Sequence, residues 1–123
     1  DSAWYRLSSP NSGDIIGVPD DEDKKASIHI KRVIALPGET VQIKEEILIN
    51  GEVYNEKDEF PAITNAGLAS EPITVGKGQY FVLGDNRNNS EDSRHNGMGL
   101  VDSDCIVGKL WFTISPWKKI GFV

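Results

Sequence analysis

Short runs of apolar residues, many of them alternating with polar ones, follow one another along most of the chain, which is typical of β-strands. The predicted strands lie at residues 13–18, 27–36, 41–43, 47–49, 52–54, 79–83 and 105–115, with a further short one near 73–75. Asn50-Gly51 separates two of these runs and is the strongest short-range signal for a β-hairpin. No segment has a sustained helical period. The pattern predicts an all-β, mostly antiparallel fold, a sandwich or partly open barrel of short strands with long loops and little helix.

The chain length of 123 residues predicts a single domain over residues 1–123, built on one hydrophobic core. Residues 55–77 lack strong periodicity and contain two prolines and two glycines, so we expect a loop-rich excursion there. Cys105 is the one cysteine, and its apolar neighbours Ile106 and Val107 predict a buried strand residue.

The charge balance narrows the classes of partner. Thirteen basic and nineteen acidic residues give a net charge of −6, without a basic stripe. Nucleic-acid binding depends on Lys and Arg against phosphate, so we predict no nucleic-acid partner. No apolar run approaches the ~20 residues that a membrane-spanning helix needs. The cysteine count and spacing also predict no metal site, and nothing indicates a cofactor.

A strongly polar segment, GDNRNNSEDSR at residues 84–94, follows directly on the apolar run Tyr80–Leu83. A long irregular segment in a small domain is usually either functional or disordered. An EF-hand calcium loop does not fit, because Arg87 stands at the third ligand position and Ser90 where glycine is required. Ion pairs of Asp85 and Asp92 with arginines such as Arg32, Arg87 and Arg94 explain the composition better.

Lys31 lies within the apolar strand at 27–36, where alternation places it on the side of His29, Val33 and Ala35, with Arg32 on the other side. Such a lysine either extends its amine to water or is desolvated. Desolvation lowers the pKa of a lysine and makes its amine a usable general base. Composition by itself favours the solvated surface lysine.

Two segments together indicate a family. KRVIALPGE (31–39) and GDNRNNSEDSR (84–94) closely resemble signature motifs of the type I signal peptidases, and SGDIIGV (12–18) is similar to a third. The likeness covers roughly residues 12–43 and 78–119, about two-thirds of the chain. It implies a membrane-bound serine endopeptidase that cleaves signal peptides from secreted preproteins at the extracytoplasmic face of the bacterial plasma membrane. It implies no nucleic acid, metal or cofactor.

The resemblance also implies roles for individual residues. Lys31 would be the general base of a Ser/Lys dyad, and Ser90 would hydrogen-bond the Lys31 amine. Asp85 would pair with Arg32, and Asp92 with Arg94. The supporting residues implied around the dyad are Arg32, Asp85, Asn86, Arg87, Asp92 and Arg94.

The nucleophilic serine of the family lies in a Ser-Met-x-Pro-Thr motif, and this sequence contains no such motif. Asp1-Ser2-Ala3 resembles only the start of this motif, because no Pro-Thr follows Ser2. Ser8, Ser9 and Ser12 fit loop residues better than a nucleophile. The nucleophile is therefore unidentified. We expect the chain to be an inactive fragment of an active peptidase, starting after the anchor helix and the serine motif.

Three alternatives stay open at this point. A catalytically inactive relative that assists the assembly of secreted or surface structures would explain the missing serine, but would have no need for Lys31 and Ser90. A self-cleaving repressor-type Ser/Lys peptidase shares the dyad chemistry, although the chain has no DNA-binding segment. A β-sandwich binding module without catalysis is the third.

Overall fold

The structure is a computed structural model that describes residues 4–5, 9–19, 28–106 and 108–110. Within these ranges the chain forms ten strands and two short 3-10 helices. The strands are β1 (Trp4–Tyr5), β2 (Ile15–Pro19), β3 (Ile28–Ala35), β4 (Thr40–Ile43), β5 (Ile47–Ile49), β6 (Glu52–Val53), β7 (Ile73–Thr74), β8 (Gln79–Leu83), β9 (Val101–Asp102) and β10 (Gly108–Leu110). The helices are η1 (Gly67–Ser70) and η2 (Ser103–Cys105).

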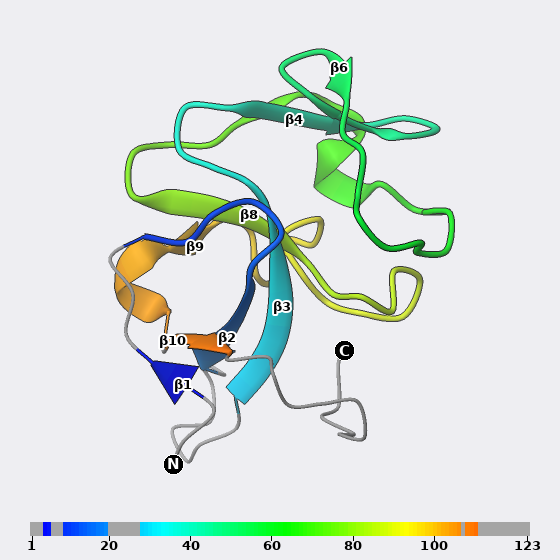
Figure 1. Ribbon diagram of the computed structural model, residues 1–123. Coiled ribbons are helices and arrows are strands. Elements are labelled where there is room, and N and C mark those ends of the chain that lie inside the picture. Colours follow the sequence, from blue (N-terminus) through cyan, green and yellow to red (C-terminus); the bar gives the residue numbers. More distant parts are fainter. Residues whose placement is uncertain (1–3, 6–8, 20–27, 107, 111–123) are drawn as a thin grey trace.

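The strands form two antiparallel sheets (Figure 1). The larger sheet has the order β1-β10-β2-β3-β8-β9, and the smaller has the order β6-β5-β4-β7. In Figure 1 the smaller sheet lies above β8 and above the upper end of β3. Neither sheet closes into a barrel in the described part of the chain. The predicted all-β, mostly antiparallel fold is confirmed.

The main hydrophobic cluster joins the two sheets. Side chains of β3 and β8 pack there with side chains of β4, β5 and η1, and Ala35, Val41, Ala69, Phe81 and Leu83 are fully buried. A second cluster lies on the opposite face of the larger sheet and contains Ile16, Val18, Val33, Tyr80, Val82 and Val101. Strand β8 contributes to both clusters because successive residues of a strand point to opposite faces.

A register shift in β3 separates Lys31 from Ala35. The pairing of β3 with β8 changes between Val33 and Ala35, as a β-bulge does. Val33 belongs to the second cluster, whereas Ile34 and Ala35 both belong to the cluster between the sheets. The prediction that Ala35 shares a face with Lys31 is therefore wrong, because the bulge breaks the two-residue period.

The predicted hairpin is confirmed: β5 pairs with β6 across Asn50-Gly51. Both turn residues have positive φ, 54° for Asn50 and 85° for Gly51, as the tight turns of two-residue hairpins require. Residues 55–77 contain η1 and β7 as their regular elements.

Cys105 is not the buried strand residue that the sequence predicts. It is exposed and ends η2, directly after the polar residues Asp102–Asp104, which favour a turn. Of the strand predicted at 105–115, the structure has β10 at Gly108–Leu110, and residues 111–115 lie outside the described part.

Replacing Phe81 by alanine tests the core assignment. Phe81 is fully buried between the sheets, so Phe81→Ala lowers the free energy of unfolding by about 3–5 kcal/mol. Leu68, whose side chain is 41% exposed, is the control, and Leu68→Ala costs at most about 0.5 kcal/mol. Urea denaturation measures both, and equal losses would contradict the assignment of the core.

Candidate active site

Lys31 lies in the middle of the larger sheet. Its strand β3 is flanked by β2 and β8, and Lys31 pairs with Ile16 of β2, a member of the second cluster. The side chain is 1% exposed, and its Nζ atom has no hydrogen-bond partner among the described residues. Of the two possibilities that the sequence left open, the structure therefore has the desolvated lysine.

Burial lowers the pKa of the Lys31 ammonium below its ordinary value. The Asp92 and Glu91 carboxylates act in the opposite direction, and the Arg94 guanidinium adds to the lowering. Burial dominates because a charge without a hydrogen-bond partner loses its hydration and receives nothing in exchange. A lysine in this environment is a better proton acceptor near neutral pH than one on the surface.

The Asp92 carboxylate accepts hydrogen bonds from several residues of the polar loop. The side chain is fully buried and accepts hydrogen bonds from Arg94 Nε at 2.8 Å and Arg94 Nη2 at 2.9 Å. It also accepts from the Gly84 backbone N–H at 3.0 Å and from Ser90 Oγ at 2.6 Å. Burial raises the pKa of Asp92, but the hydrogen bonds from Arg94, Ser90 and Gly84 outweigh it, so the pKa lies below its ordinary value. The predicted Asp92–Arg94 pair is confirmed.

Ser90 lies in the site but does not make the hydrogen bond that was predicted for it. Its hydroxyl donates to the Asp92 carboxylate, and Arg94 Nη2 lies 3.4 Å from its oxygen. The predicted Ser90–Lys31 hydrogen bond is absent from this structure, in which Nζ of Lys31 has no hydrogen-bond partner among the described residues. Ser90 is 7% exposed, and its link to the surroundings of the Lys31 amine is the hydrogen bond to Asp92.

The second predicted ion pair, Arg32 with Asp85, is confirmed in bidentate form. Arg32 Nε and Nη2 donate to the two Asp85 oxygens at 2.8 and 2.7 Å, and Nη1 donates to the Gly13 carbonyl at 3.2 Å. Arg32 is the direct sequence neighbour of Lys31, but its side chain lies on the other face of β3. The pair joins the strand of the lysine to the start of the polar loop.

Arg87 and Asn86 differ in their surroundings. Arg87 is buried, and its partner is Glu56, at 3.0 and 2.7 Å, rather than Asp85 or Asp92. Asn86 is exposed and accepts a backbone hydrogen bond from Asn89 N–H. Sequence reasoning missed Glu56, because it stands among Lys57, Asp58 and Glu59 and looks like an ordinary solvated residue.

The 55–77 segment packs along the outside of the polar loop, as Figure 1 shows for the green and yellow-green segments. Asn88 accepts from the Thr64 N–H and hydroxyl and donates to the Ala62 carbonyl. Arg94 donates to the Asn65 carbonyl, and its own carbonyl accepts from Leu68 N–H. The excursion therefore supports the loop along much of its length.

A groove of about 560 Å³ lies on the Lys31 side of the larger sheet, since His29 of β3 contributes to its lining. Other lining residues are Val18, Glu91, Met98, Leu100 and Val101.

In the described part of the chain no three His, Cys, Asp or Glu side chains are grouped so as to hold a metal ion. None of the described helices has the length and apolar character to cross a membrane.

The family profile described as "Signal peptidase, peptidase S26" matches residues 1–117. The chain belongs to this family. It is 40% identical over 117 residues to Signal peptidase I of Bacillus licheniformis and 44% identical over 117 residues to Signal peptidase I T of Bacillus subtilis (strain 168). Each match covers 88% of this chain and 61% and 58% of the respective relative, so the chain spans about three-fifths of their length.

A solved structure supports the same assignment. The crystal structure of a signal peptidase I from Enterococcus faecalis V583 is similar with a TM-score of 0.65 at 32% sequence identity. The match covers 85% of this chain and 98% of that one. Family and fold therefore agree with the resemblance that the KRVIALPGE and GDNRNNSEDSR motifs carry.

Replacing Lys31 by methionine raises the free energy of unfolding at neutral pH by about 1–3 kcal/mol, because it removes a buried amine without a hydrogen-bond partner. The folded-state pKa of Lys31 lies below the unfolded one, so between the two values the unfolded chain binds more protons. The wild type gains stability as the pH rises through that window. The advantage of methionine therefore shrinks toward pH ~10.4, the ordinary pKa of lysine.

Urea denaturation at a series of pH values measures this difference. Lys57→Met is the control for the loss of a lysine side chain at an exposed position of the same protein. Parallel stability curves for wild type and Lys31→Met would contradict the lowered pKa.

Gly67 tests the contact between the 55–77 segment and the loop. Its φ is 56°, and an added Cβ would collide with the Arg94 carbonyl oxygen. Gly51, with φ 85°, has nothing within 4 Å of that position and is the matched control. Gly51→Ala costs about 1–2 kcal/mol for backbone strain, and Gly67→Ala costs at least ~1 kcal/mol more. Thermal unfolding compares the two, and equal costs would show that the close approach is unimportant.

Proposed function

We propose that the full-length protein is a serine endopeptidase that cleaves N-terminal signal peptides from secreted preproteins, with Lys31 as its general base. The observation that carries the proposal is the burial of the Lys31 amine, 1% exposed and without a hydrogen-bond partner in the described part of the chain. Membership of the signal peptidase family supports it. In this proposal the protein acts at the extracytoplasmic face of the plasma membrane and contacts the membrane surface.

The proposed chemistry follows the Ser/Lys dyad. The neutral Lys31 amine accepts the proton of a serine hydroxyl while the serine oxygen attacks the carbonyl carbon of the scissile peptide bond. The resulting ammonium gives this proton to the leaving amine, and an acyl-enzyme forms. The amine then accepts a proton from water, whose oxygen attacks the ester carbonyl. The ammonium returns this proton to the leaving serine oxygen, and the signal peptide is released with a free carboxyl group.

We propose a nucleophile other than the described hydroxyls that contact the loop. Ser90 donates to Asp92, and Ser93 Oγ accepts from the Val82 N–H at 2.9 Å. No described serine is hydrogen-bonded to Nζ of Lys31. The proposal therefore uses a serine outside the described residues. In this proposal Asp92 has the supporting role. Ser90 and Arg94 donate hydrogen bonds to its carboxylate and hold it close enough to influence the Lys31 amine.

The groove on the Lys31 side of the sheet is the proposed site of the substrate. Extended peptides bind along strands through their backbone, while pockets select alternate side chains. We expect the groove to take the residues before the cleaved bond, with small residues in an Ala-x-Ala pattern.

Cleavage of a preprotein with an Ala-x-Ala site by the full-length protein tests the proposal. Lys31→Ala lowers kcat/KM by about 10²–10⁴-fold, the range that a general base contributes. Lys57→Ala is the control and keeps the activity of the wild type. Undiminished cleavage by Lys31→Ala would refute the dyad. Absence of cleavage by the wild type would instead favour an inactive relative that assists assembly.

A further inference from the structure

The ring of Phe60 stacks against the guanidinium groups of two arginines. The guanidinium carbon of Arg87 lies 4.1 Å from the ring centroid, and that of Arg32 lies 5.1 Å from it. Both distances are within the ~6 Å range of cation–π attraction. One aromatic side chain of the 55–77 segment thus contacts a strand residue and a loop residue that are far apart in sequence.

A carboxylate neutralises each of these arginines. Arg32 pairs with Asp85, and Arg87 pairs with Glu56 through two hydrogen bonds of 3.0 and 2.7 Å. The Arg87 side chain is 1% exposed and that of Glu56 is 15% exposed, so water cannot replace Glu56 easily. Loss of the Glu56 charge would leave a buried guanidinium without its counter-ion.

The Arg87–Glu56 pair connects to the surroundings of Lys31 through the backbone of one residue, Gly84. Arg87 Nε donates to the Gly84 carbonyl at 2.9 Å, and the Gly84 N–H donates to Asp92 at 3.0 Å. Asp92 is the carboxylate with the largest electrostatic influence on the Lys31 amine. Arg32, the other arginine on the ring, is the direct sequence neighbour of Lys31.

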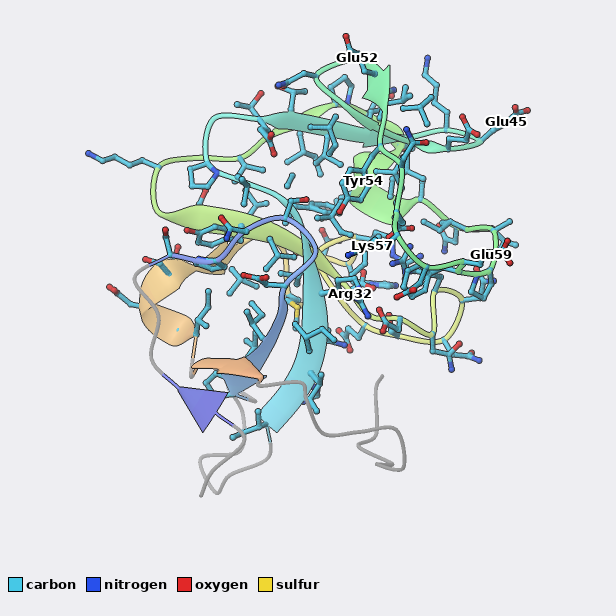
Figure 2. All side chains as sticks on the ribbon, in the orientation of Figure 1. Arg32, Glu45, Glu52, Tyr54, Lys57 and Glu59 are labelled. Carbon is cyan, nitrogen blue, oxygen red and sulfur yellow. The ribbon has the colours of Figure 1, made fainter. Side chains whose placement is uncertain are left out.

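We propose that Glu56 and Phe60 are positioning residues of the Lys31 site, which hold Arg87 and Arg32 and thereby keep the polar loop closed over the buried amine. This inference rests on the proposed function in so far as it concerns the rate of cleavage. Neither residue touches the amine or a substrate, so both act through the two arginines. Figure 2 shows Arg32 on β3, near the green loop on which Lys57 and Glu59 are labelled.

A general role in stability would lower activity only through the amount of folded protein. A positioning role makes a different prediction: a loosened loop admits water to Lys31, the ammonium form gains hydration, and the pKa of the lysine rises toward its ordinary value. The acidic limb of the kcat/KM profile then moves to higher pH, while KM stays the same because the groove is intact.

The test uses full-length protein with Glu56→Gln, which keeps the shape and loses the charge, and Phe60→Leu, which loses the ring. The matched controls are Glu59→Gln, an exposed carboxylate of the same segment at its outer side (Figure 2), and Phe60→Tyr, which keeps the ring face. Folded fraction is measured by urea denaturation. An NMR titration of ¹³C-labelled Lys31 follows the amine directly, without any cleavage reaction.

We expect kcat to fall by about 10- to 100-fold in Glu56→Gln and Phe60→Leu, with KM within about twofold. We expect the Lys31 titration to move to higher pH in both, and neither quantity to change in the controls. Folded variants with unchanged kcat and unchanged Lys31 titration would overturn the inference. So would a loss of activity that follows only the folded fraction. If the wild type does not cleave preproteins, the proposed function fails, and the Lys31 titration still decides this inference.

Discussion

The burial of one lysine amine is the constraint on which the rest of this structure depends. An ammonium group in the middle of a sheet loses its hydration, and the Lys31 Nζ atom finds no hydrogen-bond partner among the described residues to replace it. The fold therefore tolerates an unfavourable feature at this position. Such features persist where the surrounding structure is rigid enough to hold them and where their chemistry is used.

Ion pairs brace the polar loop beside the amine. Asp92 with Arg94, Asp85 with Arg32 and Glu56 with Arg87 each join two segments or brace the loop itself. Pairs of this kind contribute little on a surface but resist separation when buried, because removal of one partner leaves an uncompensated charge. They hold the irregular polar loop in place beside the site.

The 55–77 segment has a larger part in the site than its sequence indicates. It carries Glu56 and Phe60, and the backbone around Gly67 approaches Arg94 so closely that no Cβ fits. The site thus has an inner layer, formed by β3 and the polar loop, and an outer layer formed by this segment. Local sequence signals are weak for the outer layer, since its residues look like ordinary surface residues until the chain is folded.

The sequence by itself determined most of the strands and the Asn50-Gly51 hairpin, because alternation and turn chemistry are local properties. Its motifs indicated the family, and that resemblance implied the Asp85–Arg32 and Asp92–Arg94 pairs. Only the tertiary structure decided that Lys31 is desolvated, that Ser90 donates to Asp92, that Ala35 changes face and that Arg87 pairs with Glu56. These depend on which segments pack together and on a bulge in β3, and neither has a signal within a short window of sequence.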